Sequence, residues 1–252
     1  MCIGLDPAIS EQRSTNIIPA KYLKYSDENE VKLNFCLDLI RCTKDFCCAY
    51  KPNQQYIAGF TKKDHQTLTN AINKVGSISI LDYKLNDIDD TMHSALFHIQ
   101  KWGYDAVTFN PFLGNLQATV ELAHQIKLGI IVLTLTSNIE ASKYQKEAKI
   151  HGKELYTIIA EDVKKYEADG CVVGATGHIT ENEIRRIRTI VGEETIFLVP
   201  GIGTQKGDPS RVIRSGGVNL LINVGRDIIY SQDPEEKARK YNNLFNEIRF
   251  SS

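Results

Sequence analysis

The segment SISILDYKLNDIDDT, Ser77 to Thr91, joins a strand-like apolar run to a cluster of charged side chains. Its apolar half is typical of a buried strand. Asp82, Lys84 and Asp87 then follow within six residues. Because residues two apart in a strand point to the same face, we expect Asp82 and Lys84 to share a face and Asp87 to lie in the turn beyond.

Similar apolar runs recur along the chain, and each is followed by a turn signal and a segment with helical spacing. Eight runs rich in Val, Ile, Leu and Phe cover residues 1–5, 47–51, 77–84, 106–110, 129–137, 170–175, 195–201 and 219–225. Nearly continuous apolar runs are what strands buried on both faces require. Eight βα units in 252 residues predict one domain over residues 1–252, an α/β fold of the (β/α)8 TIM barrel type with eight parallel strands and surrounding helices.

Two helical signals support this pattern near the C-terminus. Thr180 and Glu183 have the spacing of a capping box, which predicts a helix that starts there. Further on, apolar residues at helical spacing form a stripe that is expected to face the sheet: Tyr241, Leu244, Phe245 and Ile248.

Composition excludes several classes of partner and site. Lys and Arg total 30 against 31 Asp and Glu, without a basic block, so neither nucleic acid nor an anionic membrane is an expected partner. The chain shows no apolar run of the ~20 residues that a membrane-spanning helix needs and no signal segment, so we expect a cytoplasmic protein. Its six Cys and six His lack metal-ligand spacing, so no metal site is predicted and the cysteines are expected to be reduced.

The chemistry of a (β/α)8 barrel lies at the C-terminal ends of its strands. Six of the predicted strands carry candidate site residues on or just after this end: Asp6, Lys51, Asp82, Lys84, Ser137, Gln205, Gly225 and Arg226. An isolated cluster of two carboxylates and an ammonium is more often a structural ion-pair network than a catalytic site. The convergence of so many polar groups at one mouth favours a site.

The loops after the last two strands favour an anion. VPGIGTQKGD, residues 199–208, and NVGRD, residues 223–227, follow strands whose loops often bind phosphate on backbone N–H groups. Arg226 offers a planar fork that matches phosphate oxygens. The glycines do not fit the G-x-G-x-x-G spacing of dinucleotide sites, and an ordinary tight turn is the alternative interpretation.

In these motifs the chain resembles the orotidine 5′-monophosphate decarboxylases, the last enzymes of pyrimidine synthesis. The resemblance covers nearly the whole chain, and the D-x-K-x-x-D element within LDYKLNDI is its most specific motif. The motifs occur in the family's order: GLDP at 4–7, YKPN at 50–53, LDYKLNDI at 81–88, TSN at 136–138, VVGAT at 172–176, VPGIGTQKGD at 199–208 and GR at 225–226.

The resemblance implies a small-molecule substrate, orotidine 5′-monophosphate, and no cofactor. It implies that the catalytic residues are Lys84, Asp82, Asp87 and Lys51, which form an array of alternating charge at the reacting carbon. It also implies a homodimer, in which Asp87 and Thr91 reach the site of the neighbouring subunit.

The resemblance assigns the remaining candidates to substrate binding. Asp6 and Lys51 are expected at the ribose hydroxyls, and Ser137 at the amide edge of the pyrimidine. Gln205, Gly225 and Arg226 are expected to hold the 5′-phosphate.

Two other functions remain open on the same barrel. The magnesium-dependent 3-keto-gulonate-phosphate decarboxylases and hexulose-phosphate synthases share the D-x-K-x-x-D element, but they carry a metal-binding glutamate where this chain has Lys51, and Mg²⁺ needs an oxygen ligand. A non-catalytic barrel that only binds sugar phosphates is the other alternative. It would have no need for a proton donor such as Lys84 beside two carboxylates.

Overall fold

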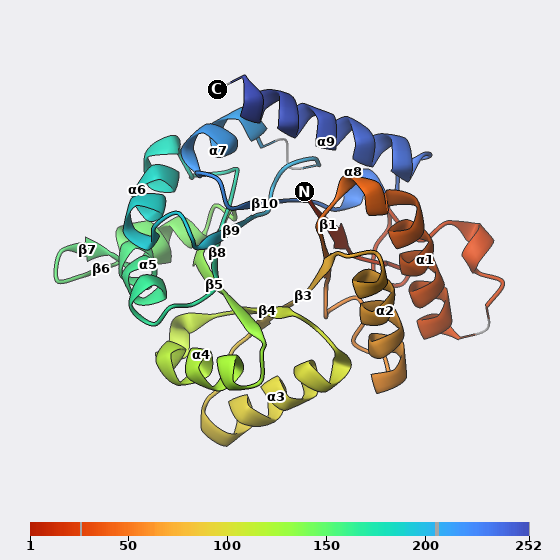
Figure 1. Ribbon diagram of the computed structural model, residues 1–252, viewed down its shortest axis with the longest axis horizontal. Coiled ribbons are helices and arrows are strands. Elements are labelled where there is room, and N and C mark those ends of the chain that lie inside the picture. The colour runs from red at the N-terminus through yellow and green to blue at the C-terminus, as the bar shows by residue number, and fades with distance from the viewer. Residues whose placement is uncertain (26, 205–206, 252) are drawn as a thin grey trace.

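The computed structural model describes residues 1–25, 27–204 and 207–251, and within them eight parallel strands close into a barrel (Figure 1). In spatial order the strands are β1 (Cys2–Leu5), β2 (Ala49–Pro52), β3 (Ile78–Leu85), β4 (Ala106–Phe109), β5 (Gly129–Leu135), β8 (Gly170–Val173), β9 (Ile196–Val199) and β10 (Leu220–Val224), and β10 pairs with β1. Each of the eight predicted runs coincides with one of these strands, although β2 and β3 each extend one residue beyond the predicted run. The predicted (β/α)8 barrel is therefore confirmed.

Helices surround the barrel as an outer ring (Figure 1). They are α1 (Glu28–Thr43), α2 (Lys62–Lys74), α3 (Asp89–Trp102), α4 (Leu116–Gln125), α5 (Leu155–Lys165), α6 (Glu181–Val191), α7 (Pro209–Ser215), α8 (Arg226–Ile229) and α9 (Pro234–Phe250). A small hairpin that the sequence did not predict, β6 (Lys149–Ile150) and β7 (Lys153–Glu154), projects between β5 and α5. Among the helices of the described ranges, none is both long enough and apolar enough to cross a membrane.

The two helical signals read from the sequence have different outcomes. The carboxylate of Glu183 accepts a hydrogen bond of 2.6 Å from the backbone N–H of Thr180, so the predicted capping box starts α6. In α9, Phe245 is buried as expected, but Leu244 is 39% exposed. The prediction that Leu244 faces the sheet was wrong, because α9 turns only the Phe245 side of the stripe inward.

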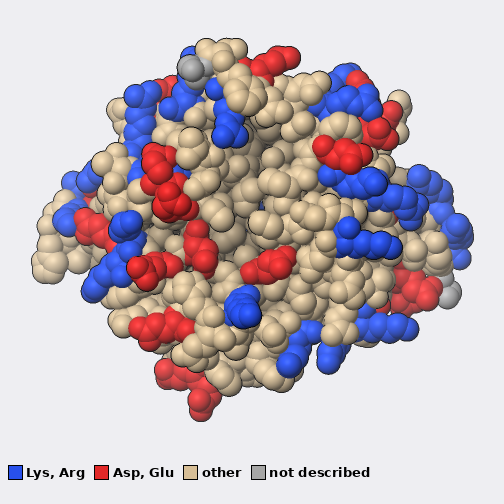
Figure 2. All heavy atoms as spheres, viewed as in Figure 1, with Lys and Arg blue, Asp and Glu red and all other residues tan. Residues whose placement is uncertain are grey.

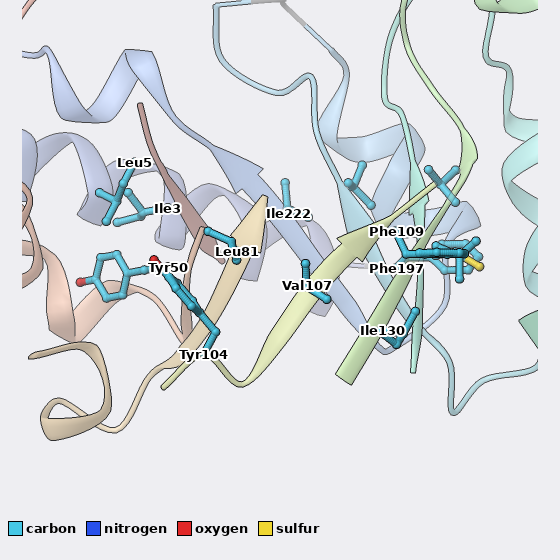
Figure 3. Close-up of a cluster of buried hydrophobic side chains, with 14 of the residues drawn as sticks. Ile3, Leu5, Tyr50, Leu81, Tyr104, Val107, Phe109, Ile130, Phe197 and Ile222 are labelled. Carbon is cyan, nitrogen blue, oxygen red and sulfur yellow. The ribbon is translucent and has the colours of Figure 1, made fainter. Parts of the chain in front are cut away.

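Alternate residues of each strand divide between two apolar layers. The outer layer joins the barrel to the helices, and Figure 3 shows part of it, with Tyr50 from β2, Val107 from β4 and Phe197 from β9. The inner layer contains strand residues alone, so it fills the barrel: Cys2, Ala49, Ile80, Ala106, Ile131, Val172, Leu198 and Leu221.

The same alternation places polar side chains directly above the inner apolar layer. Lys51, Asp82 and Thr108 each lie two residues beyond a member of that layer, so they point into the barrel toward its C-terminal mouth. All three are buried. The fold therefore places a layer of polar and charged side chains directly above the apolar interior of the barrel.

The barrel closes where its first strand meets its last. Cys2 and Ile3 of β1 pair with Asn223 and Val224 of β10. A Cβ at Gly4 would lie only 3.2 Å from Asn223 Oδ1 and 3.3 Å from a Gly225 Cα. Glycine at position 4 thus permits the close approach that closes the sheet.

Aspartates tie the strands together at the opposite end of the barrel. Asp105, which precedes β4, accepts hydrogen bonds of 2.7 Å from both the backbone N–H and the hydroxyl of Ser79 on β3. Asp169, which precedes β8, accepts 2.8 Å from the backbone N–H of Ile130 on β5. These carboxylates satisfy backbone groups of neighbouring strands at the end away from the mouth.

A buried histidine joins α2 to α3 and the start of β4. The ring of His65 stacks on Trp102 with centroids 4.2 Å apart, and its Nδ1 lies 3.0 Å from the hydroxyl of Tyr104. Burial lowers the pKa of His65 to about 4, from its ordinary value of 6.5. The folded protein therefore keeps this imidazole neutral where the unfolded chain would protonate it.

This difference predicts an acid-sensitive component of stability. Because the folded pKa of His65 lies below its unfolded value, stability should fall as the pH drops from 6.5 to 4, by about 3 kcal/mol from this residue. Urea unfolding at a series of pH values should show a loss smaller by that amount in His65→Gln. The control Thr69→Val removes a neighbouring buried hydroxyl that bonds the carbonyl of Trp102, and it should lower stability equally at every pH. An unchanged pH dependence in His65→Gln would contradict the prediction.

Candidate active site

The structure brings Lys51, Asp82 and Lys84 together at the C-terminal mouth of the barrel. Asp82 Oδ2 accepts a hydrogen bond from Lys51 Nζ, and Asp82 Oδ1 accepts one of 2.7 Å from Lys84 Nζ. Thr108 of β4 also donates its hydroxyl to Asp82 Oδ1, at 3.1 Å. One carboxylate thus links two ammonium groups from two neighbouring strands.

Burial and charge act in opposite directions in this array. Burial alone would raise the pKa of Asp82, but the ammonium groups of Lys51 and Lys84 outweigh it and hold that pKa well below its usual range. Burial would lower the pKa of Lys51, but Asp82 and Asp6 outweigh it and raise that pKa. Asp82 is therefore ionised and Lys51 protonated at neutral pH.

The backbone of Lys84 does not have the regular strand conformation that alternation assumes. Its φ is 51°, in the left-handed region, and the pairing of β3 with β4 changes register between Leu81 and Leu85. The backbone N–H of Lys84 donates 2.8 Å to the hydroxyl of Thr108, which holds the chain in this irregular conformation. The side chains of Asp82 and Lys84 lie together, as expected. The expected cause, a regular strand through both residues, was wrong.

Thr108 is a site residue that the sequence analysis missed. Its hydroxyl accepts from the Lys84 backbone and donates to the Asp82 carboxylate, so one side chain orients two members of the array. The signal was available in the run AVTFN, where Thr108 follows Ala106 at a two-residue interval and is therefore inward-facing.

Asp6 lies at the end of β1, half-buried, and its charge raises the pKa of Lys51. Its backbone carbonyl accepts a hydrogen bond of 2.7 Å from the hydroxyl of Tyr230. Asp6 therefore belongs to the same electrostatic group as the array.

Asp87 and Thr91 stand apart from the array within one chain. Asp87 Oδ1 accepts from the backbone N–H of Ile88 at 2.9 Å, and its carbonyl accepts from Asn115 Nδ2 at 2.7 Å. The ion pairs formed among the described residues do not include one between Lys84 and Asp87. Thr91 is exposed in the first turn of α3.

Ser137 follows β5 in a loop that is packed tightly against the loop after β8. A Cβ at Gly174 would lie 2.8 Å from the backbone N of Ser137, and one at Gly177 would lie 2.5 Å from its carbonyl oxygen. The preceding carbonyl, that of Thr136, accepts a hydrogen bond of 3.0 Å from His178 Nε2. Ser137 is thus held at the mouth by its neighbours.

The expected phosphate end is built by the loops after β9 and β10. Gly201 and Gly203 have φ values of 107° and 98°, which side chains rarely adopt, so glycine is required in this loop. Gly225 and the half-buried Arg226 follow β10, and over the described ranges the Arg226 guanidinium has no ion pair. Gln205 lies outside the described residues.

Charged side chains of both signs are scattered over the face that Figure 2 shows, without a continuous area of one sign. The distinctive charge of this molecule lies at the mouth of its closed parallel barrel, where a buried carboxylate is fixed between one buried and one half-exposed ammonium group. A closed parallel barrel with polar groups gathered at the C-terminal ends of its strands is the architecture of a (β/α)8-barrel enzyme. Residues 1–241 match the Orotidine 5'-phosphate decarboxylase / HUMPS family, and the chain belongs to this family.

Relatives and solved structures agree with this assignment. The orotidine 5'-phosphate decarboxylase of Cupriavidus metallidurans is 33% identical, over 97% of this chain and 89% of the relative. The structure of Leishmania donovani OMP decarboxylase superposes with a TM-score of 0.80 and 26% identity, over 100% of this chain and 94% of that one. Leishmania donovani UMP synthase gives a TM-score of 0.81 and 27% identity over 100% of this chain, which spans 54% of that longer chain.

The buried array predicts a large cost for removing one of its cations. Lys51→Met should lower the free energy of unfolding at pH 7 by about 3 kcal/mol, because it leaves Asp82 buried with one ammonium group. Urea denaturation measures this change. Lys32→Met is the matched control: Lys32 is equally buried, but its partner Glu28 is 55% exposed, so less than about 1 kcal/mol should be lost. Equal losses in the two variants would contradict the prediction.

Proposed function

We propose that this chain decarboxylates orotidine 5′-monophosphate to UMP and CO2, the last step of de novo UMP synthesis, without a cofactor. The observation that carries the proposal is the array in which Asp82 joins Lys51 and Lys84 at the barrel mouth. The curated relatives named orotidine 5'-phosphate decarboxylase, at 33% identity over most of the chain, support it. The proposal also retains the expectation of a cytoplasmic protein.

The reaction has a high barrier in water because of where its electrons are left. Loss of CO2 from C6 of the pyrimidine leaves an electron pair in an sp2 orbital that the ring cannot delocalise. A fixed cation beside C6 stabilises this developing charge more than it stabilises the neutral ground state of that carbon. The side chain that supplies the cation can then also supply the proton.

Lys84 takes both roles in the proposal. Its side chain is 54% exposed at the open mouth while its ammonium stays bonded to Asp82, so it faces the space that the substrate would enter. As the bond from C6 to the carboxylate breaks, the electron pair remains on C6 and accepts a proton from Lys84 Nζ, which gives UMP. Asp82, kept ionised by its two lysines, would lie beside the departing carboxylate and disfavour its presence.

The remaining candidates bind the parts of the substrate that do not react. Asp6 and Lys51 would contact the ribose hydroxyls, and Ser137 the amide edge of the pyrimidine. Gln205, Gly225 and Arg226 would hold the 5′-phosphate. Contacts far from C6 supply binding energy that positions the reacting carbon against the array.

The donor set argues against the magnesium-dependent alternatives. A divalent cation needs carboxylate, carbonyl or water oxygens, whereas this chain places the ammonium of Lys51 beside Asp82. A silent sugar-phosphate-binding barrel is also disfavoured, because a binding protein gains nothing from a proton donor fixed on a buried carboxylate. Decarboxylation is therefore the function that these residues support best.

We also propose a homodimer in which Asp87 and Thr91 complete the site of the partner. Asp87 makes no ion pair with Lys84 within the described part of its own chain, although the D-x-K-x-x-D element joins them in sequence. The surface around Asp87 carries exposed apolar side chains: Ile88 at 47%, Phe112 at 80% and Leu113 at 47% exposure. Such a patch is typical of an interface.

The first test follows the absorbance of orotidine 5′-monophosphate with purified protein and a metal chelator. We expect turnover that the chelator does not reduce. Lys84→Ala should lower kcat by at least about 10³-fold, because charge stabilisation and protonation are lost together.

Lys127→Ala is the matched control for this substitution. Lys127 is also an exposed lysine in the left-handed region, with φ 59°, but it precedes β5 at the opposite end of the barrel. Its variant should therefore keep wild-type turnover. Loss of wild-type activity with the chelator would favour the magnesium-dependent alternatives, and near-normal turnover of Lys84→Ala would refute the role of Lys84.

The second test addresses the shared site. Homodimers of Lys84→Ala and of Asp87→Ala should each be nearly inactive. If the two are unfolded and refolded as an equal mixture, about a quarter of all sites should recover, because half of the dimers are mixed and each mixed dimer has one intact site. Recovered activity is measured against wild-type protein refolded in the same way.

Asp82→Ala provides the control for this mixture. Asp82 and Lys84 lie in the same chain, so their two variants should not complement each other after mixed refolding. If Lys84→Ala and Asp87→Ala also failed to complement while mixed dimers were present, Asp87 would act within its own chain or the dimer would be built differently.

A further inference from the structure

The hydroxyl of Tyr230 lies against the loop that follows β1. It donates a hydrogen bond of 2.7 Å to the carbonyl of Asp6 and accepts one of 2.8 Å from the backbone N–H of Ala8. It also accepts a hydrogen bond of 3.2 Å from Arg13 Nη2. A phenol has one proton to donate and lone pairs to accept with, so this loop uses the full hydrogen-bonding capacity of the group.

Arg13 extends this hydrogen-bond network to the loop that follows β2. Its Nη2 donates to the carbonyls of Asn16 at 2.8 Å and Asp6 at 3.4 Å, and its Nη1 donates to the hydroxyl of Tyr56 at 3.4 Å. The guanidinium also lies over the rings of Tyr56 and Tyr230, at 5.2 Å and 5.3 Å from their centroids. Tyr56 follows β2 and Tyr230 follows α8, so Arg13 connects the loops after β1, β2 and β10.

Tyr230 itself is anchored to the body of the protein. Its ring stacks on Phe35 of α1, with centroids 5.6 Å apart and an interplanar angle of 23°. Burial raises the pKa of Tyr230 to about 12, so its hydroxyl stays a proton donor at every working pH. Tyr230 directly follows the short helix α8, and its backbone N–H donates a hydrogen bond of 3.2 Å to the carbonyl of Arg226, so its backbone is fixed relative to that of Arg226.

We infer that Tyr230 and Arg13 form a positioning pair that fixes Asp6 relative to the phosphate end of the site. Phosphate held by Gly225 and Arg226 would then set the position of α8, and Tyr230 would transmit it to the carbonyl of Asp6. Through Asp6 the effect reaches the ribose and Lys51, whose pKa Asp6 raises. The inference rests on the proposed function and adds two residues that do not touch the substrate.

A double-mutant cycle tests this inference. Tyr230→Phe keeps the ring on Phe35 and removes only the hydroxyl. It should lower kcat/KM for orotidine 5′-monophosphate about tenfold, because small misplacements of a binding group are costly. In an Asp6→Ala background the same substitution should change kcat/KM less than about twofold, because the backbone carbonyl that Tyr230 bonds remains but the carboxylate that it positions is gone.

Tyr22→Phe is the matched control. Tyr22 packs edge-on against the same Phe35, with centroids 5.3 Å apart, but its hydroxyl donates 2.9 Å to Asp38, away from the β1 loop. This variant should keep kcat/KM within about twofold of wild type. Arg13→Met serves as a second variant of the pair and should show the same dependence on Asp6. Circular dichroism melting establishes that each variant is folded.

The outcomes separate the inference from the function on which it rests. An active wild type with unchanged kcat/KM in Tyr230→Phe and Arg13→Met overturns the inference and leaves the proposed function standing. A loss of equal size with and without the Asp6 carboxylate also overturns it, since the pair would then act elsewhere. An inactive wild type overturns the proposed function itself, and the inference falls with it.

Discussion

The structure of the site depends on one constraint: the carboxylate of Asp82 is almost removed from water and must be compensated by protein groups. A buried ion costs several kcal/mol unless charge and hydrogen bonds replace its hydration. Lys51, Lys84 and Thr108 supply that replacement, and each comes from a position that the barrel fixes. The requirement that stabilises Asp82 thus also orients Lys84, so the proposed proton donor is in place before a substrate arrives. Preorganised charge of this kind needs no rearrangement during the reaction.

The two ends of the barrel use the same chemical groups for different purposes. At the C-terminal end, the carboxylate of Asp82 binds side-chain cations and leaves one of them facing open space. At the other end, the carboxylates of Asp105 and Asp169 accept hydrogen bonds from strand backbone. Removing Asp105 would leave the backbone N–H of Ser79 unsatisfied and lower stability, whereas the proposed function assigns Lys84, at the mouth, a role in turnover. The general separation of activity and stability between the two faces of such barrels is incomplete here, because Lys51 at the mouth is also expected to stabilise the folded chain.

Much of the fold followed from local sequence because strands buried on both faces need apolar runs, and these runs are visible without a structure. The candidate site followed partly from strand alternation, which placed Asp82 facing into the barrel mouth, and partly from strand ends, where Lys51 was expected. Alternation failed at Lys84, whose left-handed backbone depends on a hydrogen bond to Thr108, a residue 24 positions away. The sequence-based prediction for Leu244 was also wrong, because helical spacing shows which residues form an apolar stripe but not how α9 is rotated against its neighbours. Long-range contacts decided each of these outcomes.

The seam between β1 and β10 has a consequence for synthesis. The residues that close the barrel there, Cys2 and Asn223, are 221 positions apart. A ribosome that adds ~5–20 residues per second exposes β1 for on the order of ten seconds or more before its last neighbour emerges. During that interval one edge of β1 lacks its partner, and an unpaired parallel edge is a site for association with other chains. The chain must therefore remain free of such contacts while it waits, which makes the rate of translation and the presence of chaperones part of what determines its yield.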